Sequence, residues 1–263
     1  MPLVARISVS SWSIMAELPA NKALHRQFRC APLPPVSLVG SSKKNMRQIT
    51  KEDIEAIRTP WVWDLGNRIL YDMCRAHPGH SEDDEIVAKI WLIGRSYAAS
   101  IERRRNAKHI GDDFYNAVVA PTMRNQPIDL WLGSIQQTDK SGSAKTVVIH
   151  KKLMDLFHSI TDLEKRSLAS KYLHFHKPDA FFIYDSRARQ SITKIVPRLN
   201  EIPELETDEF DPEYRDFVRR CVWLRDNVQK TLGTGLTPRE IDKLLLMITD
   251  DGIRARTKPS TLP

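Results

Sequence analysis

Residues 167–192, SLASKYLHFHKPDAFFIYDSRARQSI, hold the side chains of this 263-residue chain whose types and spacing could do chemistry. An apolar run, Phe181–Tyr184, ends on the acid Asp185. The run would keep water from one side of the carboxylate, and a helix start would supply backbone N–H groups that favour its anionic form. A carboxylate placed in this way can stabilise developing positive charge or activate a water molecule. The simpler interpretation of Asp185 is an N-cap of the helix that begins at Ser186.

Positively charged side chains surround Asp185 in the sequence, and they suit the phosphates of a nucleic acid. We predict phosphate contacts from Arg166, Lys171, Lys177, Arg187 and Arg189. The alternative is that these cations form a solvated face, or that they pair with Asp179 and with the acidic loop at residues 201–216.

Missing motifs argue against several other kinds of site. The patterns GxxxxGK[ST], GxSxG and HExxH are absent from the sequence, and so is the Cys/His spacing of a zinc site. His174 and His176 could, together with Asp185, begin the metal site of a nuclease, which is one alternative function. On a helix, however, residues two positions apart point in different directions. We therefore expect neither a metal nor another cofactor.

The composition favours an anionic partner. The formal net charge is +7 and the isoelectric point is near 9.3, which points first to nucleic acid. The 3 cysteines have no CxxC spacing, as is usual in a reducing compartment. No stretch approaches the roughly 20 apolar residues of a membrane span, and serines interrupt the apolar residues near the N-terminus. We expect a monomeric, cytoplasmic protein that does not enter a membrane.

The elements that must position these residues are predicted to be helices. Residues 1–49 contain prolines, a glycine, serines and many cations, which favours a loosely structured basic arm. From Thr50 the pattern becomes helical, and residues 50–263 are predicted to form a two-lobed, all-α domain. TKED at 50–53 and TPRE at 237–240 have the pattern of capping-box helix starts.

Four more detailed expectations follow from the periodicity. Ser81 should cap a helix over residues 81–105, in which Gly94 would permit close approach of another backbone or of a ligand. Pro121 should end a short helix, and two helices should meet around residues 159–162. An apolar helical stripe is expected after Thr50, with a possible break at Thr59-Pro60, and it is formed by Ile54, Ile57, Trp61, Leu65, Ile69 and Met73.

The segments SITDLEKRSLASKYLHF, HKPDAFFIYD and SRARQSI follow one another and resemble the catalytic stretch of the helix–hairpin–helix DNA glycosylases. In that family a hairpin between two helices grips the DNA backbone, and an apolar run ends in an aspartate that caps the next helix and faces the flipped nucleotide. The resemblance implies that Asp185 is the catalytic aspartate. It also places Lys165 near the amine that forms a Schiff base in bifunctional members.

The resemblance covers about residues 155–195, and it departs from the family at the hairpin. The family hairpin carries LPGVG-like glycines, which let backbone N–H groups approach a phosphate closely. SITDLEKRS at residues 159–167 has no glycine. The side chains of Thr161, Lys165 or Arg166 would therefore have to take over these contacts.

A flipped base also needs a pocket with aromatic walls and a few polar groups. The best candidates lie near Gly94, and His174 lies one helical turn from Lys171. The residues predicted for the base pocket are Trp91, Arg95, Tyr97 and His174. Phe114, Tyr115 and Asn116 are a second candidate wall.

The resemblance implies an enzyme that excises a modified or damaged base from double-stranded DNA by hydrolysing the N-glycosidic bond. The segment looks closer to divergent bacterial relatives than to ordinary repair members of the family, and some of these relatives act against phage DNA with modified cytosines. A non-catalytic DNA-binding module is the other alternative function, beside the metal-dependent nuclease.

Overall fold

The computed structural model describes residues 46–105, 112–136 and 139–257. Contacts divide the chain into Met1–Lys43 and Lys44–Pro263, and only the second unit is described below. The basic arm expected over residues 1–49 lies almost entirely outside the described residues.

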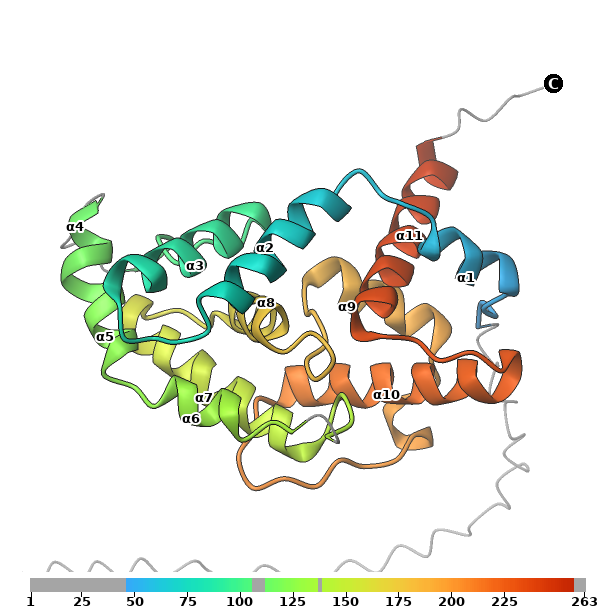
Figure 1. The fold of residues 1–263 in the computed structure, drawn as a ribbon. Coiled ribbons are helices and arrows are strands. Elements are labelled where there is room, and N and C mark those ends of the chain that lie inside the picture. Colours follow the sequence, from blue (N-terminus) through green and yellow to red (C-terminus); the bar gives the residue numbers. More distant parts are fainter. Residues whose placement is uncertain (1–45, 106–111, 137–138, 258–263) are drawn as a thin grey trace, which may run out of the picture. The chain divides into compact units, whose positions relative to one another are not determined.

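Every regular element in the described ranges is helical, as the sequence predicts (Figure 1). The α-helices are α1 (Lys51–Arg58), α2 (Asp64–Ala76), α3 (Asp83–Ser96), α4 (Asp112–Phe114), α5 (Ala120–Arg124), α6 (Ile128–Gly133), α7 (Ala144–Thr161), α8 (Arg166–His176), α9 (Ser186–Ile195), α10 (Pro212–Leu232) and α11 (Pro238–Thr257). A π-helical segment, η1 (Tyr115–Val119), joins α4 to α5, and a 3-10 turn, η2 (Leu199–Glu201), follows α9. Within this part of the chain, no helix is both long enough and apolar enough to cross a lipid bilayer.

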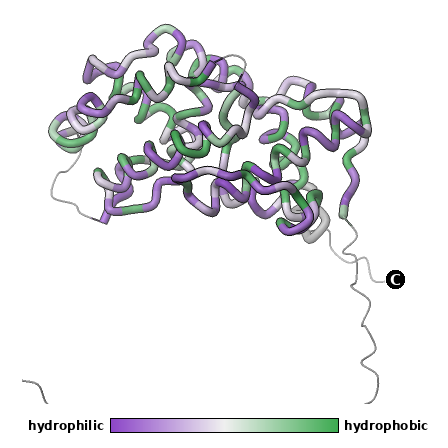
Figure 2. Tube along the Cα trace, turned by 90° about the horizontal axis from the view of Figure 1, so that it is seen from below, coloured by the Kyte–Doolittle hydropathy of each residue, from purple (hydrophilic) through white to green (hydrophobic). Residues whose placement is uncertain are grey.

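The apolar side chains of Lys44–Pro263 form two hydrophobic clusters. The first is built on α2, α3 and α5 to α8, and the second on α1, α9, α10 and α11. The chain passes from the first cluster to the second between Phe181 and Phe182, inside the apolar run that precedes Asp185. In the view from below, the two groups of helices lie beside each other, and hydrophobic and hydrophilic residues alternate along them (Figure 2). Asp185 therefore follows directly on the crossing between the two clusters.

Local capping signals are confirmed at several helix starts. The Thr50 hydroxyl accepts a hydrogen bond from the backbone of Asp53, whose carboxylate accepts one from the backbone of Thr50. Thr237 and Glu240 exchange the same pair of bonds at the start of α11. Such reciprocal caps satisfy backbone donors that the first turn of a helix leaves free.

The predicted stripe after Thr50 is correct for α1 and wrong for α2. Ile54 and Ile57 are buried, but Leu65 and Ile69 are 62% and 57% exposed. The helix breaks after Arg58, and α2 restarts at Asp64 with a different rotational phase, so that Leu70 and Cys74 face the core instead. When a helical periodicity is extended across a break between two helices, it cannot predict which face of the second helix is buried.

The helix expected over residues 81–105 is shorter. It begins at Asp83 with Glu82, not Ser81, as its N-cap, and it ends at Ser96. Ala98 adopts a left-handed backbone with φ of 50°, which turns the chain back so that Ala99 N donates to Gly94 O. A Cβ on Gly94 would lie 3.3 Å from the Cα of Ser100, which confirms the expected close approach of a backbone.

Two other expectations concern helix ends. Pro121 does not end a helix, because the π-helical segment Tyr115–Val119 runs into α5 and places the proline in the first turn, where no N–H is needed. The meeting of two helices around residues 159–162 is confirmed. Thr161 ends α7, Asp162 has a left-handed φ of 56°, and α8 begins at Arg166.

Candidate functional site

Asp185 is the N-cap of α9. Its Oδ1 accepts a hydrogen bond of 2.8 Å from the backbone N–H of Ala188. The run before it is packed into both hydrophobic clusters, and Phe181 and Phe182 are almost fully buried. The Asp185 side chain is nevertheless 26% exposed. The cap accounts for the backbone geometry of Asp185, and its exposure leaves the carboxylate accessible to another molecule.

Lys171 on α8 supplies the positive charge behind Asp185. Its ammonium lies 3.7 Å from Asp185 Oδ2 and donates to Ser167 Oγ at 2.6 Å and to the Tyr184 carbonyl at 3.1 Å. Only 1% of its side chain is exposed. Burial lowers the pKa of Lys171, and the Asp185 carboxylate opposes that fall. The sequence-based assignment of Lys171 to a phosphate contact is thus corrected, because the ammonium lies inside the protein.

Two residues of α11 complete the charged cluster. Asp242 is buried and accepts a hydrogen bond from Arg239, while its Oδ1 has no partner. Burial raises the pKa of Asp242 to about 6, and the negative charge of Asp185 contributes to this rise. The positive charges of Arg239 and Lys171 act in the opposite direction. The site therefore holds two carboxylates in different surroundings, of which only Asp185 is open to solvent.

Tyr97 joins this cluster from the first group of helices. Its hydroxyl donates to Asn67 Oδ1 on α2 at 2.7 Å, and the ammonium of Lys171 lies 5.6 Å from the centre of its ring. Burial raises the pKa of Tyr97 well above its ordinary value, with a smaller contribution from Asp185, so the hydroxyl stays a donor. Among the predicted pocket residues, Tyr97 lies in the same charged cluster as Asp185.

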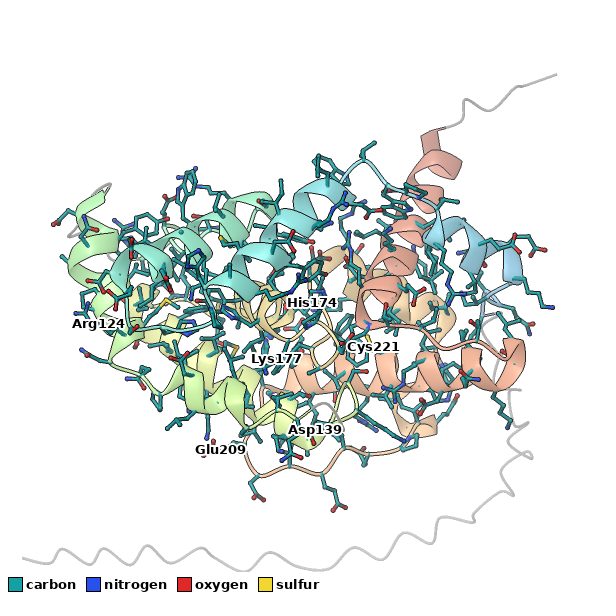
Figure 3. All side chains as sticks on the ribbon, viewed as in Figure 1. Arg124, Asp139, His174, Lys177, Glu209 and Cys221 are labelled. Carbon is teal, nitrogen blue, oxygen red and sulfur yellow. The ribbon has the colours of Figure 1, made fainter. Side chains whose placement is uncertain are left out.

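His174 is buried and neutral. Its Nδ1 donates to the Phe181 carbonyl at 2.8 Å, and its Nε2 accepts from the Tyr71 hydroxyl at 2.6 Å. Burial lowers the pKa of His174 to about 4. Figure 3 shows His174 among the helices and Lys177 beyond the end of α8. His174 thus fixes the start of the run that leads to Asp185 and does not line a pocket.

The histidine pair does not form the start of a metal site. His174 has both ring nitrogens engaged, and His176 lies two positions further on, near His80. In the described part of the chain, no group of three His, Cys, Asp or Glu side chains is arranged to hold a metal ion.

The side chain of Lys165 contacts residues other than Asp185. Its ammonium donates to the carbonyls of Ser100, at 2.9 Å, and of Arg103. Burial lowers the pKa of Lys165 to about 8. The amine beside Asp185 is that of Lys171, two helical turns further along α8.

Most of the other predicted phosphate contacts are paired within the chain. Arg166 donates two bonds to Asp211 and also pairs with Glu213, which in turn pairs with Arg189. Arg187 pairs with Asp250. The acidic segment at 201–216 thus neutralises part of the positive charge around α9, which is the alternative considered from the sequence. Among the described residues, Lys177 is the one member of these five without a carboxylate within ion-pair distance.

The remaining pocket candidates make their contacts away from Asp185. Arg95 pairs with Glu102, which also accepts a bond from the Tyr115 hydroxyl at 2.9 Å. Trp91 is 44% exposed, while Phe114 is buried in the first cluster. No contact links Trp91 or Arg95 to Asp185 in the described residues.

Sequence reasoning missed the contribution of α2. Asn67 is a buried polar residue that holds Tyr97, and Asp64 accepts a bond of 2.9 Å from Lys243 on α11. The opposite face of α2 exposes large apolar side chains beside Arg68. The exposed apolar residues of this face and of the turn that leads into α2, termed the α2 patch, are Val62, Trp63, Leu65 and Ile69. In the sequence, the one signal for this arrangement is that the polar Asn67 shares a helix face with the apolar Leu70 and Cys74.

Comparisons with protein-family models, with curated proteins and with solved structures found no match for this chain.

Proposed function

We propose that this protein is a DNA glycosylase of the helix–hairpin–helix type, which hydrolyses the bond between a modified or damaged base and its deoxyribose. The observation that carries the proposal is the state of Asp185. Its carboxylate is open on one side, receives a backbone N–H on Oδ1, and has the Lys171 ammonium 3.7 Å from Oδ2. The meeting of two hydrophobic clusters just before Asp185 supports the proposal, because the resemblance implies two lobes.

In this reaction the base leaves with the electron pair of the N-glycosidic bond, and positive charge develops on the sugar. The Asp185 carboxylate stabilises that charge. It then accepts a proton from the water molecule whose oxygen bonds to the sugar carbon, which leaves an abasic site. The Ala188 N–H and the Lys171 ammonium hold the carboxylate in one orientation throughout these steps.

The α2 patch is the surface that we assign to DNA. α2 is tied to the site through Asn67 and Tyr97, and through Asp64 and Lys243. Trp63 is 71% exposed, and its ring can stack on a base or fill the space that a flipped base leaves. Arg68, which is exposed on the same helix, can contact a phosphate.

The turn between α7 and α8 takes the place of the family hairpin. The Thr161 hydroxyl accepts a bond from Leu163 N and donates to Phe157 O, which closes the turn without a glycine. Because Lys165 and Arg166 are engaged within the protein, we expect backbone groups of residues 162–165, and not these side chains, to face DNA.

The experiment that tests the proposal measures base release from a panel of double-stranded DNAs. The panel contains alkylated, oxidised and deaminated bases and cytosines with bulky 5-substituents, including glucosylated phage DNA. The proposal predicts release of a free base and formation of an abasic site from at least one DNA, unchanged in EDTA. DNA cleavage that EDTA abolishes would instead identify a metal-dependent nuclease, and DNA binding without base release would identify a binding module.

A further inference from the structure

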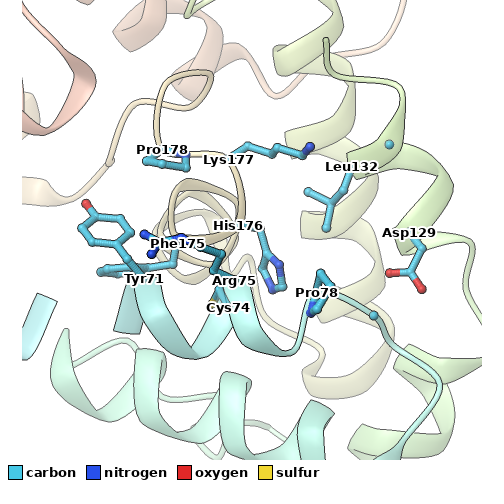
Figure 4. A pocket seen from close by; sticks show the side chains of 12 residues that line it. Tyr71, Cys74, Arg75, Pro78, Asp129, Leu132, Phe175, His176, Lys177 and Pro178 are labelled. Atoms are coloured by element: carbon cyan, nitrogen blue, oxygen red, sulfur yellow. The ribbon is translucent and has the colours of Figure 1, made fainter. Parts of the chain in front are cut away.

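A second site is formed where the C-terminal ends of α2 and α8 meet α6. A cavity of about 480 Å³ lies there, within the size range of small-molecule sites in proteins. Figure 4 shows Tyr71 on one side of the cavity, Asp129 on the opposite side, and His176 between them. Asp185 does not line this cavity.

We propose that this cavity is a binding site for a nucleoside monophosphate, that is, for a planar heteroaromatic ring that carries an anionic group. This inference is independent of the proposed glycosylase activity, because neither Asp185 nor Lys171 takes part in it.

The apolar walls suit the planar ring. Tyr71 and Phe175 pack against each other with ring centres 4.7 Å apart, and both line the cavity. Pro78, Leu132 and Pro178 supply the other apolar surfaces. Aromatic and proline surfaces bury a flat ring without the loss of side-chain entropy that flexible residues incur.

Two cations at the rim suit the anionic group. Lys177 lines the cavity and, among the described residues, has no ion-pair partner. Arg75 also lines it, and its exposed guanidinium contacts Asp72 at 3.0 Å, which leaves further N–H groups free. A phosphate between these side chains would receive charge-assisted hydrogen bonds.

Asp129 lines the far wall of the cavity, where a buried polar network holds it, and its carboxylate suits the N–H groups of a base. Asp129 accepts the backbone N–H of His80 at 3.1 Å and holds His80 Nδ1 at 2.6 Å, while His80 Nε2 is 2.7 Å from the Tyr172 hydroxyl. These bonds fix the Asp129 carboxylate, which is still 54% exposed and can accept a further donor.

His176 is the unsatisfied member of this wall. Its buried Nε2 has no hydrogen-bond partner, although its ring lies 5.1 Å from that of His80 and 4.8 Å from that of Tyr172. Burial holds the pKa of His176 well below the ordinary histidine value, so the ring is neutral and can donate or accept.

The test is calorimetric titration of the full-length chain with AMP, GMP, CMP and dTMP, each up to about 1 mM. At least one of them is expected to bind with a 1:1 stoichiometry. The nucleoside without its phosphate should bind at least about tenfold more weakly, because the charge-assisted contact is missing. Inorganic phosphate alone should also bind at least about tenfold more weakly, because the ring contacts are missing.

Two pairs of variants locate the ligand. Gly133→Phe should abolish binding, since Gly133 lines the cavity and a Cβ there meets no atom within 4 Å. Gly66→Phe is the matched control, because Gly66 has the same free space on α2 but does not line the cavity. Lys177→Glu should weaken binding at least about tenfold, and Lys230→Glu, an exposed lysine on α10, should not.

No binding of any of the four nucleotides to the wild-type protein would overturn the proposal. Equal binding by Gly133→Phe and Gly66→Phe, with circular dichroism showing both folded, would overturn it as well. Base release from DNA by the wild-type protein has no bearing on either outcome, so that failure of this inference and failure of the glycosylase proposal are distinguishable.

Discussion

The Lys171 ammonium lies 3.7 Å from the Asp185 carboxylate, but only the carboxylate can be reached from solvent. The side chain of Lys171 is 1% exposed and that of Asp185 is 26% exposed. The pair thus has an outer and an inner member. Asp185, the outer member, can contact a substrate. Lys171, the inner member, acts through Asp185 as a positioning residue.

This arrangement predicts hydrolysis without a lyase step. The Lys171 amine is held by Ser167 and Tyr184, and the Lys165 amine by two carbonyls, so neither is free to attack the sugar carbon. Borohydride added during the reaction should trap no protein–DNA complex. A trapped complex would contradict this prediction, and its loss in Lys171→Gln or in Lys165→Gln would show which amine forms it.

The two roles of Asp185 can be separated by substitution. Asparagine caps a helix about as well as aspartate, whereas alanine does not. Asp185→Ala should therefore lower the free energy of unfolding by about 1 kcal/mol more than Asp185→Asn does, as measured by urea denaturation. Equal stability of the two variants would mean that the 2.8 Å bond to Ala188 N contributes little.

The α2 patch is expected to bind DNA through Trp63. Trp63→Ala should weaken DNA binding about tenfold or more, because stacking on one base contributes roughly 1–3 kcal/mol. Trp63→Phe should retain most of the affinity. Leu130→Ala is the control, since Leu130 is 75% exposed on α6, outside the patch. Fluorescence anisotropy at fixed salt measures all three, and equal losses for Trp63→Ala and Leu130→Ala would contradict the assignment.

Acid should destabilise the protein through its buried histidines. Burial lowers the pKa of His150 and of His174 to about 4, below the ordinary value of about 6.5. The stability that each neutral ring contributes is present above pH 6.5 and is lost as the pH falls through about 4, on the order of 3 kcal/mol each. Asp242, with a raised pKa of about 6, acts in the opposite direction and offsets part of this loss.

The corresponding measurement is urea denaturation between pH 7 and pH 4. His174→Gln should reduce the slope of stability against pH by about one proton in this range. An identical slope for wild type and His174→Gln would contradict the prediction.

Features with a local signal were predictable from the sequence. The Asp185 cap, the capping boxes at Thr50 and Thr237, and the buried face of α10 depend on residues within a few positions of one another. Their outcome is set by backbone donors and helical periodicity, which the sequence displays directly.

Features that depend on packing between distant segments were not predictable. Lys165 is the N-cap of α8 and Lys171 lies in its middle, and only the packing of α8 against Tyr184 decides which amine meets Asp185. Asp242 lies 57 positions after Asp185, and the acids that neutralise Arg166 come 45 and 47 positions after it. The exposure of Leu65 depends on the phase at which α2 restarts, which the Thr59–Trp63 connection sets.

The most direct test of the central claim compares base release by wild type and by Asp185→Asn. The substitution keeps the helix cap and the shape of the side chain but removes the negative charge. With a DNA that the wild type processes, under single-turnover conditions and with equal binding, Asp185→Asn should release the base at least about 100-fold more slowly. A wild-type rate for Asp185→Asn would contradict the account, and Asp185 would then be a helix cap alone.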